Sequence, residues 1–108
     1  MAGIEYSPQA LIDLQRLREY ISTNWGEDVA KRILTKITSD IRKLEQYPVS
    51  GVDLGRIIDI TTDYRYLYSE KNYVFYYLDF DRVRIVRIIN EKQDYIQQLF
   101  GSSSKFDE

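Results

Sequence analysis

The chain contains no cysteine and no histidine among its 108 residues. Without cysteine it can form no disulfide bond and perform no thiolate chemistry. Without histidine it lacks the usual general base near neutral pH and the commonest ligand of transition metals. Any acid–base chemistry must therefore use Asp, Glu, Lys, Arg or Tyr side chains.

Several other signals are missing. No apolar run approaches the roughly 18 residues that a membrane helix needs, and no signal peptide opens the chain. There is no phosphate-binding glycine loop, no set of paired zinc ligands and no carboxylate spacing typical of a metal loop. The net charge is −2, whereas nucleic-acid-binding domains usually carry a strong basic excess. We therefore expect a cytoplasmic protein with no membrane partner, no cofactor, no metal and no direct DNA binding.

Three runs with strand character fill much of the second half of the chain. Six of the ten tyrosines lie between Tyr64 and Tyr77, and aromatic residues favour a pleated, half-buried surface. The run from Tyr73 to Leu78 is apolar or aromatic at every position, which predicts a central strand covered on both faces. We expect Val74 or Phe75 to be among the most buried side chains.

The third run alternates in a way that makes one arginine unusual. Period-two alternation places Arg87 on the same face as three aliphatic residues. The four residues of this predicted face are Val83, Ile85, Arg87 and Ile89. Because a charged group among aliphatic neighbours is costly to bury, Arg87 needs a partner or a functional purpose.

The first half of the chain predicts two helices. Ser7 and Pro8 form a helix start, because the serine oxygen can cap free amides and proline at the first helical position loses no hydrogen bond. Residues 23–26 interrupt the pattern, and a second helix is expected from Glu27 to Gln46. The first helix has an apolar stripe of Leu11, Leu14, Leu17 and Ile21, with Asp13, Arg16 and Glu19 between them; the second has Ala30, Ile33, Ile37, Ile41 and Leu44.

These elements predict an α+β domain. Gly3–Tyr6 reads as an N-terminal strand, the helices as an antiparallel hairpin, and the three later runs as an antiparallel meander. Residues 57–60 fit a short strand or a loop, and Asp94 starts a short C-terminal helix. We expect one domain over residues 1–101 and a flexible tail over residues 102–108.

The order and spacing of the later motifs resemble the RelE/ParE superfamily of toxins from bacterial type II toxin–antitoxin modules, and most closely its ParE-like branch. The resemblance covers about residues 3 to 101. The residues that carry it are Tyr64 to Tyr68, Asn72-Tyr73, Tyr76-Tyr77, Arg87-Ile88-Ile89, Asp94-Tyr95 and Leu99-Phe100.

The resemblance implies a candidate toxic site of Arg65, Arg87, Lys92 and Tyr95. In RNA-cleaving members such residues would clamp the phosphate and assist proton transfer during mRNA cleavage in the ribosomal A site. The alternative is a purely structural role, in which Arg65 and Arg87 form ion pairs or hydrogen bonds with Asp94, Asp63 or a backbone carbonyl. The chain departs from its relatives at positions where they often carry basic or ionisable groups, namely Leu78, Asn90 and Gln93.

Three functions remain open at this point. The first is a ParE-like toxin that binds DNA gyrase, the second a RelE-like ribosome-dependent mRNA endonuclease, and the third a non-toxic interaction domain. The acidic composition and the lost basic residues favour the first. Both toxin functions imply a cognate antitoxin with a disordered segment that folds on the toxin. We expect that segment to bind the apolar residues of the helical hairpin, namely Leu14, Leu17, Ile21, Ile33 and Ile37.

Overall fold

The computed structural model describes residues 2–101 and confirms the α+β prediction. The predicted flexible tail, residues 102–108, lies outside the described residues. The elements in chain order are β1 (Gly3–Tyr6), α1 (Pro8–Trp25), α2 (Glu27–Arg42), η1 (Lys43–Glu45), β2 (Val52–Asp53), η2 (Leu54–Arg56), β3 (Arg65–Ser69), β4 (Asn72–Asp79), β5 (Arg82–Asn90) and α3 (Tyr95–Phe100).

One five-stranded sheet organises these elements, with the strand order β1-β5-β4-β3-β2. The predicted central strand is confirmed, because β4 lies in the middle and both Val74 and Phe75 are fully buried. The meander β3–β4–β5 is antiparallel, but β1 pairs with β5 in parallel, so the whole sheet is mixed. Residues 57–60 form a loop, and the short strand of this region is β2 instead.

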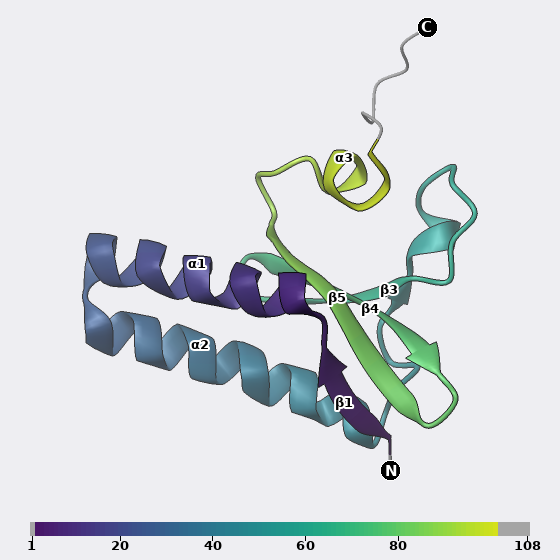
Figure 1. The fold of residues 1–108 in the computed structure, drawn as a ribbon, viewed down its shortest axis with the longest axis horizontal. Coiled ribbons are helices and arrows are strands. Elements are labelled where there is room, and N and C mark those ends of the chain that lie inside the picture. The colour runs from purple at the N-terminus through teal and green to yellow at the C-terminus, as the bar shows by residue number, and fades with distance from the viewer. Residues whose placement is uncertain (1, 102–108) are drawn as a thin grey trace, which may run out of the picture.

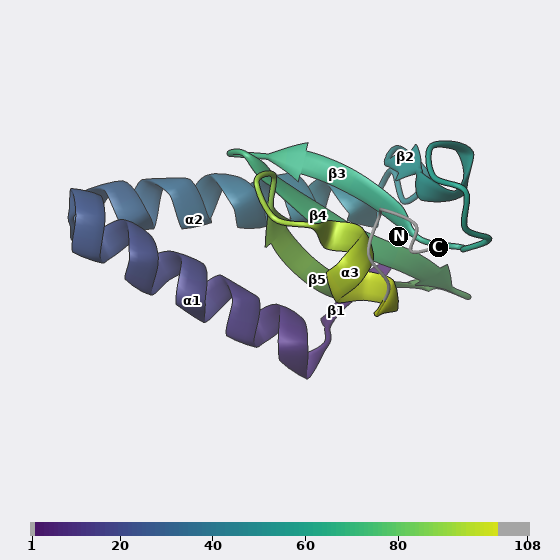
Figure 2. The ribbon, with the colours of Figure 1, turned by 90° about the horizontal axis from the view of Figure 1, so that it is seen from above.

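The helical hairpin covers one face of the sheet and extends beyond it (Figure 1). Its core residues Ala10, Ile37 and Ile41 pack against the face of β4 and β5 that carries Val74 and Tyr76. The opposite face carries a second, mainly aromatic cluster around Phe75, Ile89 and Leu54, against which residues of α3 pack. Figure 2 shows α3 over this part of the sheet. No helix within residues 2–101 is long and apolar enough to span a membrane.

Local signals set most of the boundaries. Ser7 caps α1 by accepting a hydrogen bond from the amide of Ala10 at 2.9 Å, and Pro8 occupies the first turn. Asp94 likewise caps α3 by accepting from the amide of Gln97. Gly26 alone links α1 to α2, and its φ of +96° is accessible to glycine but strained for other residues.

Two helix predictions were wrong in detail. The second helix ends at Arg42, and Lys43–Glu45 form a tighter 3₁₀ turn that still buries Leu44. In α1 the buried stripe is rotated from the predicted one: Leu11 is 53% exposed, whereas Asp13, predicted on the polar side, is buried. A polar side chain therefore occupies a core-facing position of α1.

The predicted face of β5 was also wrong, because a β-bulge interrupts the strand. Phe75 pairs with Arg87 but the next residue, Tyr76, pairs with Ile85, so Val86 is the extra residue. The bulge reverses the alternation: Val83 and Ile85 face the helices, as does Ile88, whereas Ile89 faces the aromatic cluster. The four predicted residues therefore do not share a face.

Asp40 joins the hairpin to the edge of the meander. Its carboxylate accepts hydrogen bonds from Lys36 Nζ at 2.8 Å, Lys43 Nζ at 3.3 Å and Ser69 Oγ of β3 at 2.7 Å. Partial burial opposes ionisation, but the hydrogen bonds outweigh it and lower the pKa of Asp40 below its usual value. Folding therefore favours the ionised form of this residue.

We expect Asp40→Asn to destabilise the protein most above about pH 5, where Asp40 is ionised in both the folded and the unfolded state. A carboxylate with a lowered folded-state pKa loses its stabilising contribution as the pH falls through that pKa. The difference in melting temperature between wild type and variant should therefore shrink below about pH 4. Thermal unfolding followed by circular dichroism at several pH values measures it. Asp59→Asn, at an exposed position, is the control; an equal gap at pH 7 and pH 3 would contradict the prediction.

Candidate functional site

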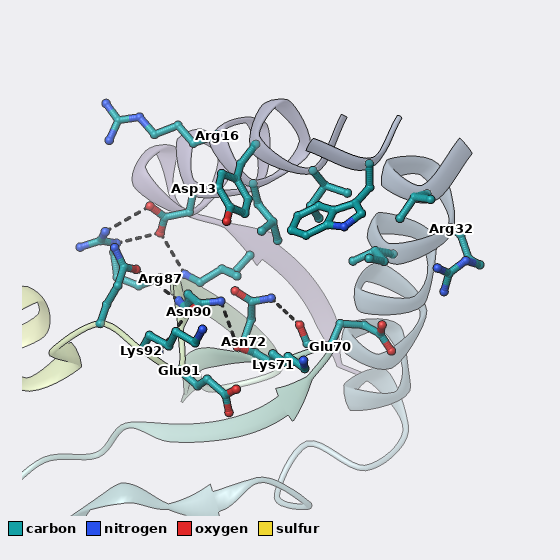
Figure 3. A pocket seen from close by; sticks show the side chains of 18 of the residues that line it. Asp13, Arg16, Arg32, Glu70, Lys71, Asn72, Arg87, Asn90, Glu91 and Lys92 are labelled. Carbon is teal, nitrogen blue, oxygen red and sulfur yellow. Dashed lines mark hydrogen bonds and ion pairs between the residues drawn. The ribbon is translucent and has the colours of Figure 1, made fainter. Parts of the chain in front are cut away.

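A groove of about 840 Å³ lies between the overhanging part of the helical hairpin and the adjoining end of the sheet (Figure 3). We call it the hairpin groove. The hairpin contributes Asp13, Arg16, Leu17, Tyr20, Ile21, Trp25, Val29, Arg32 and Ile33; the β3–β4 turn contributes Glu70, Lys71 and Asn72; and β5 with the segment after it contributes Arg87, Ile88, Asn90, Glu91, Lys92, Gln93 and, from α3, Gln98.

The apolar part of the hairpin groove comes from facing residues of α1 and α2. Ile21 is buried, while Leu17 and Ile33 are half-buried and pack against the core. Tyr20 and Trp25 are 59% and 60% exposed, and their rings meet edge to face at 5.8 Å. Large aromatic side chains left half in solvent beside an apolar floor are typical of a binding surface.

The electrostatics of the groove differ from those of the whole chain. Its lining holds five basic and three acidic side chains, although the protein carries a net charge of −2. Two of the acidic groups are engaged, because Asp13 pairs with Arg87 and Glu91 accepts a hydrogen bond from the Tyr68 hydroxyl at 2.6 Å. Four of the basic side chains have no carboxylate within ion-pair distance among residues 2–101; these are Arg16, Arg32, Lys71 and Lys92.

Asp13 and Arg87 form a junction at one wall of the groove. Arg87 donates from Nε to Asp13 Oδ2 at 2.8 Å and from Nη2 to Asp13 Oδ1 at 3.1 Å, a two-pronged ion pair. The second nitrogen also donates to Gln98 Oε1 of α3 at 3.0 Å. Asp13 Oδ2 in addition accepts the backbone N–H of Ile88 at 2.9 Å. The two side chains are only 7% and 19% exposed, so the guanidinium is held and largely screened from solvent.

The β-sheet geometry explains why a carboxylate is needed there. The pairing of β1 with β5 ends at Tyr6 and Ile85, which leaves the remainder of β5 without a neighbouring strand on that side. Ser7 donates its hydroxyl to the carbonyl of Val86 at 2.8 Å, and Asp13 takes the N–H of Ile88. The side chains of the N-cap residue Ser7 and of Asp13 in α1 thus replace hydrogen bonds of a missing strand.

Arg65 lies away from the groove. Its Nη1 donates to the carbonyls of Val49 at 3.3 Å and Gly51 at 3.1 Å. It pairs across the sheet with Tyr76, whose side chain faces the helices. A backbone-bound arginine is one of the structural alternatives anticipated from the sequence, whereas the actual partner of Arg87, Asp13, was not anticipated.

Lys92 and Tyr95 lie in different parts of the structure. Lys92 lines the hairpin groove together with Arg87. Tyr95 instead packs on the aromatic face of the sheet, with ring centroids 5.1 Å from Phe75 and 5.4 Å from Tyr73. Burial, followed by nearby Tyr66, Tyr73 and Asp94, raises the pKa of Tyr95 above its ordinary value. The structure brings only two of the four candidate toxic-site residues, Arg87 and Lys92, into one cavity.

Of the residues predicted to bind the antitoxin, some line the hairpin groove and others pack in or against the core. Leu17, Ile21 and Ile33 line the groove. Ile37 is fully buried in the core, and Leu14 packs against that core without lining the groove. Sequence reasoning missed Tyr20, Trp25, Arg16 and Arg32, although a tyrosine and the only tryptophan flanking a helix break were a usable signal.

The hairpin groove offers no obvious place for a metal. Within residues 2–101, no group of three or more Asp and Glu side chains is placed to hold a metal ion. Its chemistry is that of an apolar trough with a basic rim. Such a surface suits a segment that presents apolar side chains on one side and carboxylates on another.

Comparisons with known proteins agree with this fold. Residues 4–95 match the family described as the ParE toxin of the type II toxin–antitoxin system parDE. A solved structure of the chromosomal ParDE toxin–antitoxin system from P. aeruginosa is similar, with a TM-score of 0.70 at 17% identity, over 83% of this chain and 96% of that one. The YoeB–YefM complex from Staphylococcus aureus gives a TM-score of 0.50 at 16% identity, over 82% and 95%. No curated protein matches the chain.

The Asp13–Arg87 junction can be tested by a double-mutant cycle. Asp13→Ala leaves the guanidinium unpaired and removes the acceptor of the Ile88 N–H, so we expect it to cost about 3 kcal/mol of unfolding free energy. Arg87→Met should also be costly, because it leaves the Asp13 carboxylate 7% exposed without a cationic partner. The double variant should lose less than the two single losses combined. Urea unfolding measures all four proteins; strictly additive losses would mean that the two residues do not act as a pair.

Proposed function

The chain belongs to the ParE toxin family of type II toxin–antitoxin systems, and we propose that it arrests growth by binding DNA gyrase and that it is neutralised by an antitoxin that binds its hairpin groove. Both halves of this proposal assign function to surfaces and require no catalytic group. The observation that carries it is that three of the four polar side chains expected to do chemistry either are engaged in holding the fold or lie on another face of the sheet.

Cleavage of RNA by attack of a 2′-hydroxyl needs a base, a cationic clamp on the phosphorane and an acid, all converging on one phosphate. Arg87 is bound at two nitrogens by Asp13 and Gln98, and Arg65 is bound by two backbone carbonyls on the helix side of the sheet. Tyr95 packs on the opposite, aromatic face. Three of the four candidate residues are thus occupied or separated, which favours inhibition by protein contact.

The hairpin groove supports the antitoxin half of the proposal. An amphipathic helix binds by placing apolar side chains into a trough of this kind. Leu17, Ile21 and Ile33 form the floor, with Tyr20 and Trp25 at the open end of the hairpin. The free basic side chains at the rim favour a segment that carries Asp or Glu beside its apolar residues. A disordered antitoxin segment of that composition would fold as it binds.

A ribosome-dependent endonuclease is the second candidate. One observation favours it: Arg16, Arg32, Lys71 and Lys92 gather around a single concave surface, where they could contact phosphates. The likeness to the YoeB–YefM complex concerns the fold alone. Against it, two of the three carboxylates of the groove, Asp13 and Glu91, are engaged, which leaves only Glu70 to act as a base.

Purified components distinguish the two targets. We expect the protein to inhibit the supercoiling of relaxed plasmid by gyrase, and to leave mRNA intact on translating ribosomes. Equimolar antitoxin should restore supercoiling. Cleavage of mRNA in the ribosomal A site with gyrase unaffected would overturn the gyrase proposal in favour of the endonuclease.

The groove is tested by Trp25→Ala. A half-exposed tryptophan at a binding surface often contributes 2 kcal/mol or more, so we expect about 30-fold weaker binding of the antitoxin. Leu11→Ala is a matched control, because Leu11 is similarly exposed on the same helix but does not line the groove. Isothermal titration calorimetry gives both affinities. Equal affinities for Trp25→Ala and wild type would place the antitoxin elsewhere.

A further inference from the structure

The segment between η1 and β2 exposes large apolar side chains close together. Tyr47 and Val49 are 63% and 62% exposed, and Val52, at the start of β2, is 43% exposed. We call residues 47–52 the apolar loop. Exposed apolar residues scattered singly need no explanation, but three within six positions form a patch.

Two side chains of the sheet hold the backbone of the apolar loop in place. The hydroxyl of Tyr76 donates to the carbonyl of Pro48 at 2.9 Å and accepts the N–H of Gly51 at 2.9 Å. Arg65 donates to the carbonyls of Val49 and Gly51. Four backbone groups of this short loop are thus satisfied by β3 and β4, which form the centre of the fold. The loop is a fixed part of the sheet edge.

Gly51 shows how closely the loop is fitted to the sheet. A Cβ atom at this position would lie 2.3 Å from the Tyr76 hydroxyl and 2.8 Å from the carbonyl of Tyr66. Only glycine allows the loop backbone to approach so closely. A loop fixed in this way loses little conformational entropy when it binds, so its exposed side chains are preorganised for a partner.

The charge beneath the loop indicates the chemistry of that partner. Among residues 2–101, no carboxylate lies within ion-pair distance of Arg65, so its charge is balanced only by carbonyl dipoles. A partner with an apolar patch and a carboxylate at its edge would complement both the apolar loop and this charge.

The apolar loop and the hairpin groove are separate surfaces. Arg65, under the loop, begins β3, whereas Glu70 and Lys71, which line the groove, follow its other end. Four strand residues at about 3.3 Å each separate the two by roughly 13 Å. Figure 1 shows the C-terminal end of α2, from which the loop continues, at the opposite end of the hairpin from the α1–α2 link. No residue of the loop lines the groove.

We propose that the apolar loop is the surface with which this toxin contacts its protein target, through Tyr47 and Val49 packed on an apolar patch bordered by carboxylates. This inference rests on one part of the proposed function, namely that the toxin acts by binding a protein. It assigns Arg65 and Tyr76 the role of positioning residues for the loop.

The test uses the full chain with Tyr47→Ser and Val49→Ser combined. Both side chains point into solvent, so circular dichroism and antitoxin affinity should match wild type. We expect the concentration for half-inhibition of gyrase to rise at least about tenfold, and growth arrest on induction to be lost. Leu11→Ser, at 53% exposure, is the control and should arrest growth like wild type.

The outcomes separate the two proposals. If wild type arrests growth but leaves both gyrase and mRNA on translating ribosomes unaffected, and the double variant does not arrest growth, the target is another protein and the apolar loop still binds it. Growth arrest by the double variant at wild-type level would overturn the inference. So would an equal loss of antitoxin affinity, because the two surfaces would then not be separate.

Tyr76→Phe tests the positioning role. It removes only the hydroxyl that holds Pro48 and Gly51, and leaves the exposed side chains and the buried ring in place. We expect weaker gyrase inhibition with unchanged antitoxin affinity. Inhibition equal to wild type would show that the loop needs no support from the sheet and would remove the preorganisation argument.

Discussion

A single carboxylate takes the place of a missing strand in this fold. Because β1 stops at Tyr6, the second half of β5 has an open edge, and an open edge is both unsatisfied and prone to pairing with other chains. Asp13 closes that edge by accepting the N–H of Ile88 and holding Arg87. Arg87 in turn holds Gln98 of α3. One largely buried ion pair and its hydrogen bonds therefore connect α1, β5 and α3, in addition to their hydrophobic packing.

This dependence shapes the function that the fold supports. A guanidinium bound on both sides by the protein is a poor clamp for a phosphate, since it would have to leave one partner to bind another. The same is true of Arg65, which is committed to the backbone of the apolar loop. Both arginines are thus bound by groups of the protein itself, Arg87 at the junction with Asp13 and Arg65 beneath the apolar loop. What remains available is an apolar trough with a basic rim and a fixed apolar loop.

The sequence predicted those parts of the fold that depend on local chemistry. The cap by Ser7, the cap by Asp94 and the central position of Tyr73–Leu78 follow from signals within a few residues. The bulge at Val86 was not predicted, because alternation assumes an uninterrupted strand and no residue marks the extra position.

The pairing of Asp13 with Arg87 was not predicted for another reason. The two residues lie 74 positions apart in the chain, and only tertiary packing brings a polar position of α1 to the edge of β5. The candidate site followed the same rule: helical spacing predicted the apolar residues Leu17, Ile21 and Ile33, which line the groove, whereas the partner of Arg87 was not predicted.

Two separate surfaces also constrain how neutralisation can work. Under the proposed arrangement, an antitoxin segment confined to the hairpin groove leaves the apolar loop open, since about 13 Å of β3 lies between them. Occupation of the groove alone then leaves Tyr47 and Val49 uncovered, so it blocks the target by overlap only if the bound target also extends over the groove. A ligand suppresses binding at a second surface only if it binds the target-bound toxin less tightly than the free toxin. The contacts with Tyr76 and Arg65 leave the loop little freedom to change shape. The structure therefore shows no segment whose conformational change would transmit antitoxin binding to the loop. The coupling is then steric: either the target extends from the loop over the groove, or antitoxin residues beyond the groove segment extend along the sheet toward the loop and exclude the target.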